Sequence, residues 1–404
     1  MLFIFVATGI LILAYAYIGC RLIIPMGIKL PWKTGLWVIL ILFMPMSTSY
    51  LILRRQGAGA LWCDVLAWVA YLSLGFFCLV FTFLVIRDLA LLVVCVAKKG
   101  LDLIQHIVTP GTGLDKPPAP ERRSFLIYTT NLSILGVSGA IAGYGFCNTR
   151  YRPNIVRVSV PILNLPADLE GFRIVQITDI HISPTIKKSY VENIVEQVND
   201  LKPNIIAFTG DLADGPVSIF RNDAAPLKDL SADYGSYFVT GNHEYYAGAE
   251  AWIEETSRLG LTVLLNEHRI IRHNTGRILL AGVTDYNAGR FFSGHVSDPN
   301  KAISGAPESN VKILLAHQPR SIFSSGKVGF DLQISGHTHG GQFFPWQFLV
   351  GLQQPYLAGL HQYNKTWIYV SRGTGYWGPP IRLGAPAEIT EIMLTKKHQA
   401  KNTA

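Results

Sequence analysis

The chain has 404 residues, of which 49% are hydrophobic and only 15% are charged. Such an apolar composition is unusual for a soluble protein and favours membrane-spanning segments. The formal net charge of +8 is compatible with an acidic membrane surface or an anionic substrate. The sequence contains no run of Lys and Arg interleaved with aromatic residues, the pattern typical of nucleic-acid binding, so nucleic acid is not an expected partner.

Four long uncharged runs in the first 150 residues predict an all-α region with four membrane spans. Each run is close to the length that crosses a hydrocarbon core as a helix. Pro45 should kink the second span, and the shorter run Leu89–Ala97 either extends the third helix or lies along the membrane interface. The four runs are Leu2–Cys20, Leu36–Leu53, Val65–Ile86 and Phe125–Cys147.

The distribution of Lys and Arg near these spans predicts how the chain crosses the membrane. The first and third connecting loops carry most of these residues and should be cytoplasmic. The domain after the fourth span then lies outside the cytoplasm, and we expect the protein in a bacterial inner (cytoplasmic) membrane. The segment at 108–121 is rich in Pro and Gly and predicts a flexible loop before the fourth span.

The five cysteines all occur within the first 147 residues. We therefore expect no disulfide framework, and thiolate ligation of a metal is excluded for the rest of the chain.

From about residue 154, short β-rich runs alternate with amphipathic helical stretches at 188–200 and 247–259. This alternation is typical of an α/β domain whose strands are buried in a central layer. We predict a four-span membrane domain at 1–150, an α/β domain at 151–396 and a tail at 397–404. The β-rich runs lie at 172–178, 204–209, 234–240, 278–284, 312–317, 331–335 and 367–371.

Two motifs that follow predicted strands each contain a pair of polar side chains. Asp179 and His181 occur in ITDIH, and His337 and His339 occur in GHTH. Residues two apart in an extended segment point to the same side, so each pair can present two ligands to one site. Both motifs lie at the carboxyl ends of strands, where α/β folds place ligand sites.

The motifs FTGD, TGNHE and LAH complete a set of seven candidate metal ligands. Seven donors are too many for one ion with an open position, and two ions that share Asp211 and hold a bridging hydroxide fit them better. The mixture of oxygen and nitrogen donors suits manganese first, with iron or zinc as alternatives, and has too much nitrogen for calcium. The seven are Asp179, His181, Asp211, Asn242, His317, His337 and His339.

His243 follows a predicted ligand and is expected to be catalytic, donating a hydrogen bond or a proton to the phosphate or the leaving group. Glu244 should orient its neighbours by hydrogen bonding, and Asp214 should lie in a turn or support the ligands. The histidines outside the motifs are expected to be ordinary surface residues, and these are His268, His273, His295 and His361.

The order DxH, GD, GNHE, a single His and GHTH resembles that of the calcineurin-like metallophosphoesterase superfamily over roughly residues 155–395. The segment SRGTGYWGPPIRLGAPAEIT is similar to its membrane-anchored bacterial branch. The resemblance implies a double β-sandwich flanked by helices, with His243 near the scissile phosphate. It implies that one ion is held by Asp179, His181, Asp211 and His339. It implies that the other is held by Asp211, Asn242, His317 and His337.

The uncharged segment at 343–360 follows the second pair of histidines. It either packs on the core as a structured loop or enters the lipid surface and presents lipid head groups to the metals. Arg372 and Arg382 either help to hold an anionic substrate there or pair with carboxylates.

Three classes of function are consistent with these features. The first is a membrane-bound phosphodiesterase or phosphomonoesterase with two metals, whose partners are a phosphate-ester substrate, including a lipid-linked one, and the bilayer. The second is a pyrophosphatase that acts on a nucleotide- or polyprenyl-linked lipid. The third is a non-catalytic transport or sensing protein with a structural metal site. Asp64 is the main ionisable group expected in the spans, which weighs against transport.

Overall fold

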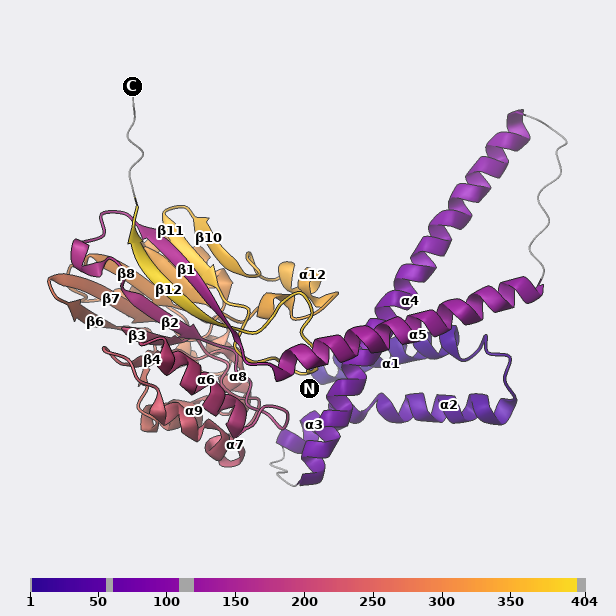
Figure 1. The fold of residues 1–404 in the computed structure, drawn as a ribbon, viewed down its shortest axis with the longest axis horizontal. Helices are drawn as coiled ribbons and strands as arrows, with labels where there is room; N and C mark the ends of the chain where they lie inside the picture. The colour runs from indigo at the N-terminus through magenta and orange to yellow at the C-terminus, as the bar shows by residue number, and fades with distance from the viewer. Residues whose placement is uncertain (1, 56–60, 109–119, 398–404) are drawn as a thin grey trace. The chain divides into compact units, whose positions relative to one another are not determined.

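The structure is a computed structural model that describes residues 2–55, 61–108 and 120–397. Nearly all of the predicted loop at 108–121 and of the predicted tail at 397–404 lies outside these residues. The chain divides into two compact units (Figure 1). One comprises Met1–Ile52 and Val65–Tyr144, and the other comprises Leu53–Asp64 and Gly145–Ala404.

Apolar helices make up the first unit. Among the described residues, three segments are long and apolar enough to cross a membrane, namely Leu30–Tyr50, Leu61–Ile104 and Glu121–Arg150, whereas Thr8–Leu22 is a shorter apolar helix. The count of four spans therefore stays a prediction. The helices of this part of the chain are α1 (Leu2–Leu22), α2 (Leu30–Phe43), α3 (Met46–Arg55), α4 (Leu61–Val108) and α5 (Pro120–Arg150).

Two details of these helices match their sequences. The helical conformation is interrupted around Pro45, between the end of α2 and the start of α3, as the missing N–H of proline predicts. The run Leu89–Ala97 continues α4, so the alternative in which it extends the third helix is correct.

A polar cluster joins α1, α4 and α5 within the first unit. The carboxylate of Asp88 accepts a hydrogen bond from the Tyr17 hydroxyl at 2.6 Å. It also pairs with Arg21 at 2.6 Å and with Arg87 at 2.7 Å. Asn131 accepts a hydrogen bond from Arg87 and donates one to the carbonyl of Arg21 at 2.9 Å. Charged groups in apolar helices are expensive unless they are paired, and here the pairing holds three helices together.

Arg87 and Asp88 lie inside the apolar segment Leu61–Ile104. The interpretation that Asp64 is the main ionisable group of the spans was therefore incomplete, because α4 continues beyond the expected end of the third span.

The second unit contains two six-stranded mixed sheets, which confirms the α/β class. The first sheet, in spatial order, consists of β1 (Asn154–Ile162), β12 (Glu388–Lys396), β2 (Arg173–Ile177), β3 (Ile205–Phe208), β4 (Ser236–Phe238) and β5 (Thr262–Val263). The second consists of β10 (Gly359–Tyr363), β11 (Thr366–Val370), β9 (Leu332–Ser335), β8 (Val311–Leu315), β7 (Gly276–Gly282) and β6 (Glu267–His273).

One buried cluster contains side chains from both sheets. Ile174 and Ile205 come from the first sheet, and Leu280, Ile313 and Ile334 come from the second. Burial on both faces explains why these strands read as continuous apolar runs rather than as alternating patterns.

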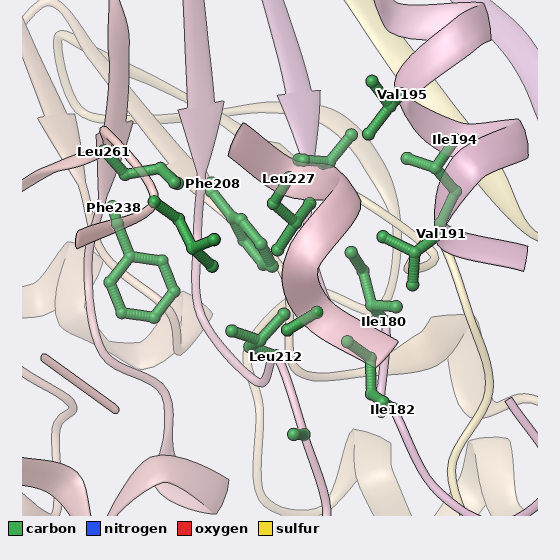
Figure 2. Packing of buried hydrophobic residues seen from close by; sticks show 14 of the residues in the cluster. Ile180, Ile182, Val191, Ile194, Val195, Phe208, Leu212, Leu227, Phe238 and Leu261 are labelled. Carbon is green, nitrogen blue, oxygen red and sulfur yellow. The ribbon is translucent and has the colours of Figure 1, made fainter. Parts of the chain in front are cut away.

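A second buried cluster lies between the first sheet and helices of this unit (Figure 2). Phe208 and Phe238 of the sheet belong to it together with Val191 and Ile194, which lie three residues apart on one face of α6. The helices of this unit are α6 (Lys188–Asp200), α7 (Val217–Ala224), α8 (Asn242–Ala247), α9 (Ala249–Arg258), α10 (Pro299–Ile303), α11 (Ile322–Val328) and α12 (Trp346–Gly351).

Leu227 belongs to this second cluster and is 1% exposed, whereas Leu163 is 55% exposed. We expect Leu227→Ala to reduce the free energy of unfolding by about 2–5 kcal/mol, because it leaves a cavity in a packed core. Leu163→Ala removes the same atoms from the surface and should change it by less than about 0.5 kcal/mol. Thermal unfolding of the purified full-length variants measures the difference, and equal shifts for the two variants would contradict the described packing.

Candidate metal centre

Loops that follow strands of both sheets bring the predicted ligands together. In the first sheet β2, β3 and β4 run parallel, so their carboxyl ends lie at one edge. In the second sheet β8 and β9 are also parallel. Asp179, Asp211 and Asn242 follow the first three strands, and His317 and His337 follow the other two.

Several of these residues adopt a backbone conformation that side chains usually avoid. The φ angles of Asp179, His181, Asp211, His337 and His339 lie between 52° and 73°. Each such residue costs on the order of 1–3 kcal/mol, and strain of this kind concentrates at functional sites. The prediction that each pair lies in an extended segment was therefore wrong, although both pairs do reach the site.

Because glycine has no Cβ atom, the carboxylates of Asp179 and Asp211 can approach the backbone at Gly336 and Gly241. A Cβ atom at Gly336 would overlap the carboxylate of Asp179 and the hydroxyl of Thr178. A Cβ atom at Gly241 would overlap the carboxylate of Asp211. Glycine at these two positions is therefore required by close packing around the site.

Asp179, His181 and His339 form a first group whose potential ligand atoms lie within 4.8 Å of one another. The Nε2 atoms of His181 and His339 are 3.0 Å apart. Asp179 Oδ1 lies 3.5 Å from His339 Nε2 and 3.9 Å from His181 Nε2. The backbone N–H of His337 donates to the Asp179 carboxylate at 2.9 Å, which links this group to the second histidine motif.

Asp211, His317 and His337 form a second group under the same distance limit. His317 Nε2 lies 3.1 Å from His337 Nδ1 and 3.2 Å from both Asn242 Oδ1 and Asp211 Oδ2. The same Asp211 oxygen is 3.7 Å from His181 Nε2 of the first group. Asp211 therefore lies between the two groups, where a shared ligand would have to be.

His243 lies beside both groups but makes a different set of contacts. Its Nδ1 is 2.8 Å from Asp214 Oδ1, and its backbone N–H donates to Asp211 Oδ1 at 2.8 Å. Its ring meets that of His181 edge to face, with 4.6 Å between the centroids. His243, His181 and Asp211 also satisfy the distance limit of a third possible metal group.

Asp214 supports two histidines at once. The Oδ1 atom that contacts His243 also lies 2.7 Å from His181 Nδ1. A carboxylate in this position fixes the orientation of each ring and leaves its Nε2 directed into the site. Of the two roles considered for Asp214, the structure thus favours support of the candidate ligands.

Glu244 orients its neighbours, as expected. Its carboxylate accepts hydrogen bonds from the backbone N–H groups of Gly241 at 2.6 Å, Leu212 at 2.8 Å and Asp211 at 3.0 Å. These bonds tie the start of α8 to the loop that carries Asp211.

The carboxylates of the site place positive charge on two histidines. Burial alone would lower the pKa of His317, but Asp211 and Asp179 raise this pKa to about 10. Burial would also lower the pKa of His243, and Asp211 and Asp214 raise it to about 9. Burial and the charge of His317 lower the pKa of His337 to about 3. The carboxylates that cause these shifts also attract metal ions, and a divalent ion that binds there displaces the proton of His317, because only a neutral imidazole binds a metal.

The two arginines considered as substrate contacts are held by the protein itself. Arg372 pairs with Glu388 at 2.7 Å, as expected if this arginine pairs with a carboxylate. Arg382 is 1% exposed and donates to the carbonyls of Gly375 and Ala385, so neither alternative describes it. Its guanidinium lies 3.2 Å from His339 Nδ1.

The segment at 343–360 is partly packed on the domain and partly exposed, and its entry into lipid stays a prediction. Phe343 is buried, and Gln354 is buried and bonded to Gln318 at 3.2 Å. Between them, Phe348 of α12 is 64% exposed, and Leu352, directly after the helix, is 83% exposed. The segment is therefore a structured loop with an exposed apolar surface.

The four histidines outside the motifs also lie outside the metal groups. Each is half-buried and hydrogen-bonded to a neighbouring group. Their partners are the carbonyls of Ala302 and Ala358 and the hydroxyls of Tyr234 and Tyr245, which contact His268, His361, His273 and His295 respectively.

We expect Asp214→Asn to weaken the binding of Mn²⁺ by about 10- to 100-fold, because the amide orients the two imidazoles less well than the carboxylate. Calorimetric titration of the purified protein with Mn²⁺ measures the affinity. Asp200→Asn makes the same change at an exposed position at the end of α6 and should have no effect. Full affinity in the Asp214 variant would contradict the supporting role.

Comparison with known proteins identifies the family. A family model described as Calcineurin-like phosphoesterase matches residues 172–341. An uncharacterized metallophosphoesterase of Campylobacter jejuni is 30% identical over 400 residues, which cover 98% of this chain and 99% of the relative. An uncharacterized metallophosphoesterase of Helicobacter pylori is 40% identical over 275 residues, which cover 67% of this chain and 72% of the relative.

A vertebrate relative is named for both a transmembrane region and a metallophosphoesterase domain. The "transmembrane protein with metallophosphoesterase domain" of Danio rerio is 39% identical over 266 residues, or 64% of this chain. The match spans 61% of the length of that relative and of its Bos taurus counterpart. Together with the full-length match to the Campylobacter jejuni protein, these similarities show that the chain belongs to the calcineurin-like metallophosphoesterase family.

Proposed function

We propose that this protein is a membrane-bound phosphoric ester hydrolase that uses two divalent metal ions to cleave phosphodiester or phosphomonoester bonds. The observation that carries the proposal is the convergence of imidazole nitrogens beside one carboxylate oxygen. His181 and His339 contribute one pair of nitrogens 3.0 Å apart, and His317 and His337 contribute another pair 3.1 Å apart. Such a buried set of nitrogen and oxygen donors suits borderline divalent ions.

The residues present fit two ions that share Asp211. The first would be held by Asp179, His181, Asp211 and His339. The second would be held by Asp211, Asn242, His317 and His337. Manganese is the first candidate, with iron or zinc as alternatives. When bound, the ions would stabilise charge on the phosphoryl oxygens and lower the pKa of a water molecule.

His243 is the proposed catalytic residue of the chain. Asp214 holds its Nδ1, so its Nε2 is available to donate a hydrogen bond or a proton to the phosphate or the leaving group. In the metal-free site, Asp211 and Asp214 raise the pKa of His243 to about 9, so these carboxylates favour the protonated ring that a proton donor requires. Glu244 supports this geometry by holding the backbone of Asp211 and of Gly241.

We further propose that the two sheets form the double β-sandwich that the sequence resemblance implies. The buried cluster that contains side chains from both sheets supports this arrangement. It would place the carboxyl ends of strands from both sheets beside one site, as the ligand set requires.

Removal of metal tests the proposed function. Purified protein should bind about two Mn²⁺ ions per chain, and a chelator should abolish hydrolysis of an activated aryl phosphate until Mn²⁺ is restored. Asp211→Ala should lose both metal and activity, because it removes a ligand of both ions. Asp200→Ala is the control and should retain both. A structural metal site in a transport or sensing protein predicts instead no hydrolysis, with or without Asp211.

A substrate panel separates ester hydrolysis from the pyrophosphatase alternative. The panel would contain a phosphomonoester, a phosphodiester and a nucleotide-linked pyrophosphate, each assayed with the Mn²⁺-loaded protein. The proposal requires turnover of one of the two esters, and exclusive cleavage of the pyrophosphate would replace it.

We propose that the protein resides in a bacterial inner membrane with its catalytic domain outside the cytoplasm and with four spans. The three long apolar segments, the shorter helix Thr8–Leu22 and the Lys and Arg residues of the predicted cytoplasmic loops support this proposal. A reporter that works only outside the cytoplasm should therefore be active when fused after Ala404. Activity of a cytoplasm-only reporter at the same position would contradict the orientation.

A further inference from the structure

We propose that Tyr246, Phe291 and Trp377 form an aromatic collar that binds the hydrocarbon chain of a lipid phosphate ester beside His243. The inference rests on the proposed function and names the class of substrate for the same site. Because His243 is the proposed donor to the phosphate or leaving group, side chains around its ring contact the substrate next to the scissile bond.

The three rings come from separate segments, and two of them contact the His243 ring directly. The Tyr246 ring lies 5.3 Å from the His243 ring, and the Trp377 ring lies 6.0 Å from it. Phe291 extends the surface, because its ring lies 5.6 Å from that of Tyr246. These centroid distances correspond to direct aromatic contacts.

The rings are exposed although they are large and apolar. The exposed fractions are 52% for Tyr246, 51% for Trp377 and 47% for Phe291. A contiguous group of such side chains marks a site of interaction more often than a packing surface. Their position around a candidate catalytic residue makes the substrate the expected occupant.

Hydrogen bonds and ring packing hold parts of the collar in place. Gln342 is 7% exposed and lies three residues after His339. Its side chain accepts from the Trp377 N–H at 2.9 Å and donates to the Trp377 carbonyl at 2.9 Å. Phe291 packs on Tyr245, whose hydroxyl lies 2.9 Å from His295 Nδ1. A surface held in place in this way loses little conformational entropy when a ligand binds.

Apolar surface near the collar favours a hydrocarbon chain over a nucleobase. The segment that begins at Gln342 continues into α12, where Phe348 is 64% exposed, and Leu352 directly after the helix is 83% exposed. Trp and Tyr suit the boundary between water and lipid, because each has an apolar body and a polar group. The same chain contains segments long enough to cross a membrane, which favours a substrate found in membranes.

Binding of alkylphosphonates to the Mn²⁺-loaded full-length protein tests the collar. Methylphosphonate and butylphosphonate share the phosphoryl group and differ only in hydrocarbon length, and calorimetry gives the ratio of their Kd values. Each buried methylene group strengthens binding by up to about fourfold, so butylphosphonate should bind at least about tenfold more tightly. In Trp377→Ser and Tyr246→Ser this ratio should fall to about threefold or less. Trp377→Phe should keep most of it.

Phe323→Ser is the matched control, because Phe323 is 48% exposed and contacts Tyr363 rather than the collar. It should leave the ratio unchanged. An equal ratio in the wild type and the collar variants would overturn the proposal. Phenylphosphonate serves as an aromatic probe in the same titration. If the collar substitutions weakened the binding of phenylphosphonate alone, the substrate group would be aromatic and the proposal would also be overturned. Failure of the loaded protein to bind methylphosphonate would instead contradict the proposed function itself.

Discussion

The carboxylate of Asp211 is the contact on which the rest of the site depends. One oxygen lies 3.2 Å from His317 and 3.7 Å from His181, and the other accepts the backbone N–H of His243 at 2.8 Å. Glu244 in turn binds the backbone N–H of Asp211. Candidate ligands from both sheets and the candidate proton donor thus all contact the side chain of Asp211. Small displacements of its loop would therefore disturb all of them.

Surrounding contacts stabilise the strained backbone of the candidate ligands. Residues with positive φ persist only where surrounding contacts determine them, and several of the ligands have such contacts. Asp179 accepts the N–H of His337, Glu244 holds the loop of Asp211, and Arg382 lies against His339. Buried polar groups that satisfy one another also explain how so many charged and polar side chains remain inside an apolar domain.

The proposed lipid substrate would explain why one chain contains both apolar helices and a candidate metal site. The helical unit contains an internally paired polar cluster around Asp88, which serves to join helices. The aromatic collar is an apolar surface that contacts His243, the proposed catalytic residue. A lipid phosphate ester would place its charged group among the metal ligands and its chain on these rings, so both parts of the molecule would have complementary contacts.

The sequence by itself determined the α/β class, the strands that carry the motifs and the candidate donor set, because each depends on local periodicity or on residue type. Only the tertiary structure decided which atoms meet. The pairing of β1 with β12 joins the two ends of the domain, and Asp214 contacts two histidines from different loops. The left-handed conformation of the ligands and the collar around His243 likewise arise from contacts between segments distant in sequence. Such contacts have no local pattern, since the folded backbone alone sets the distances.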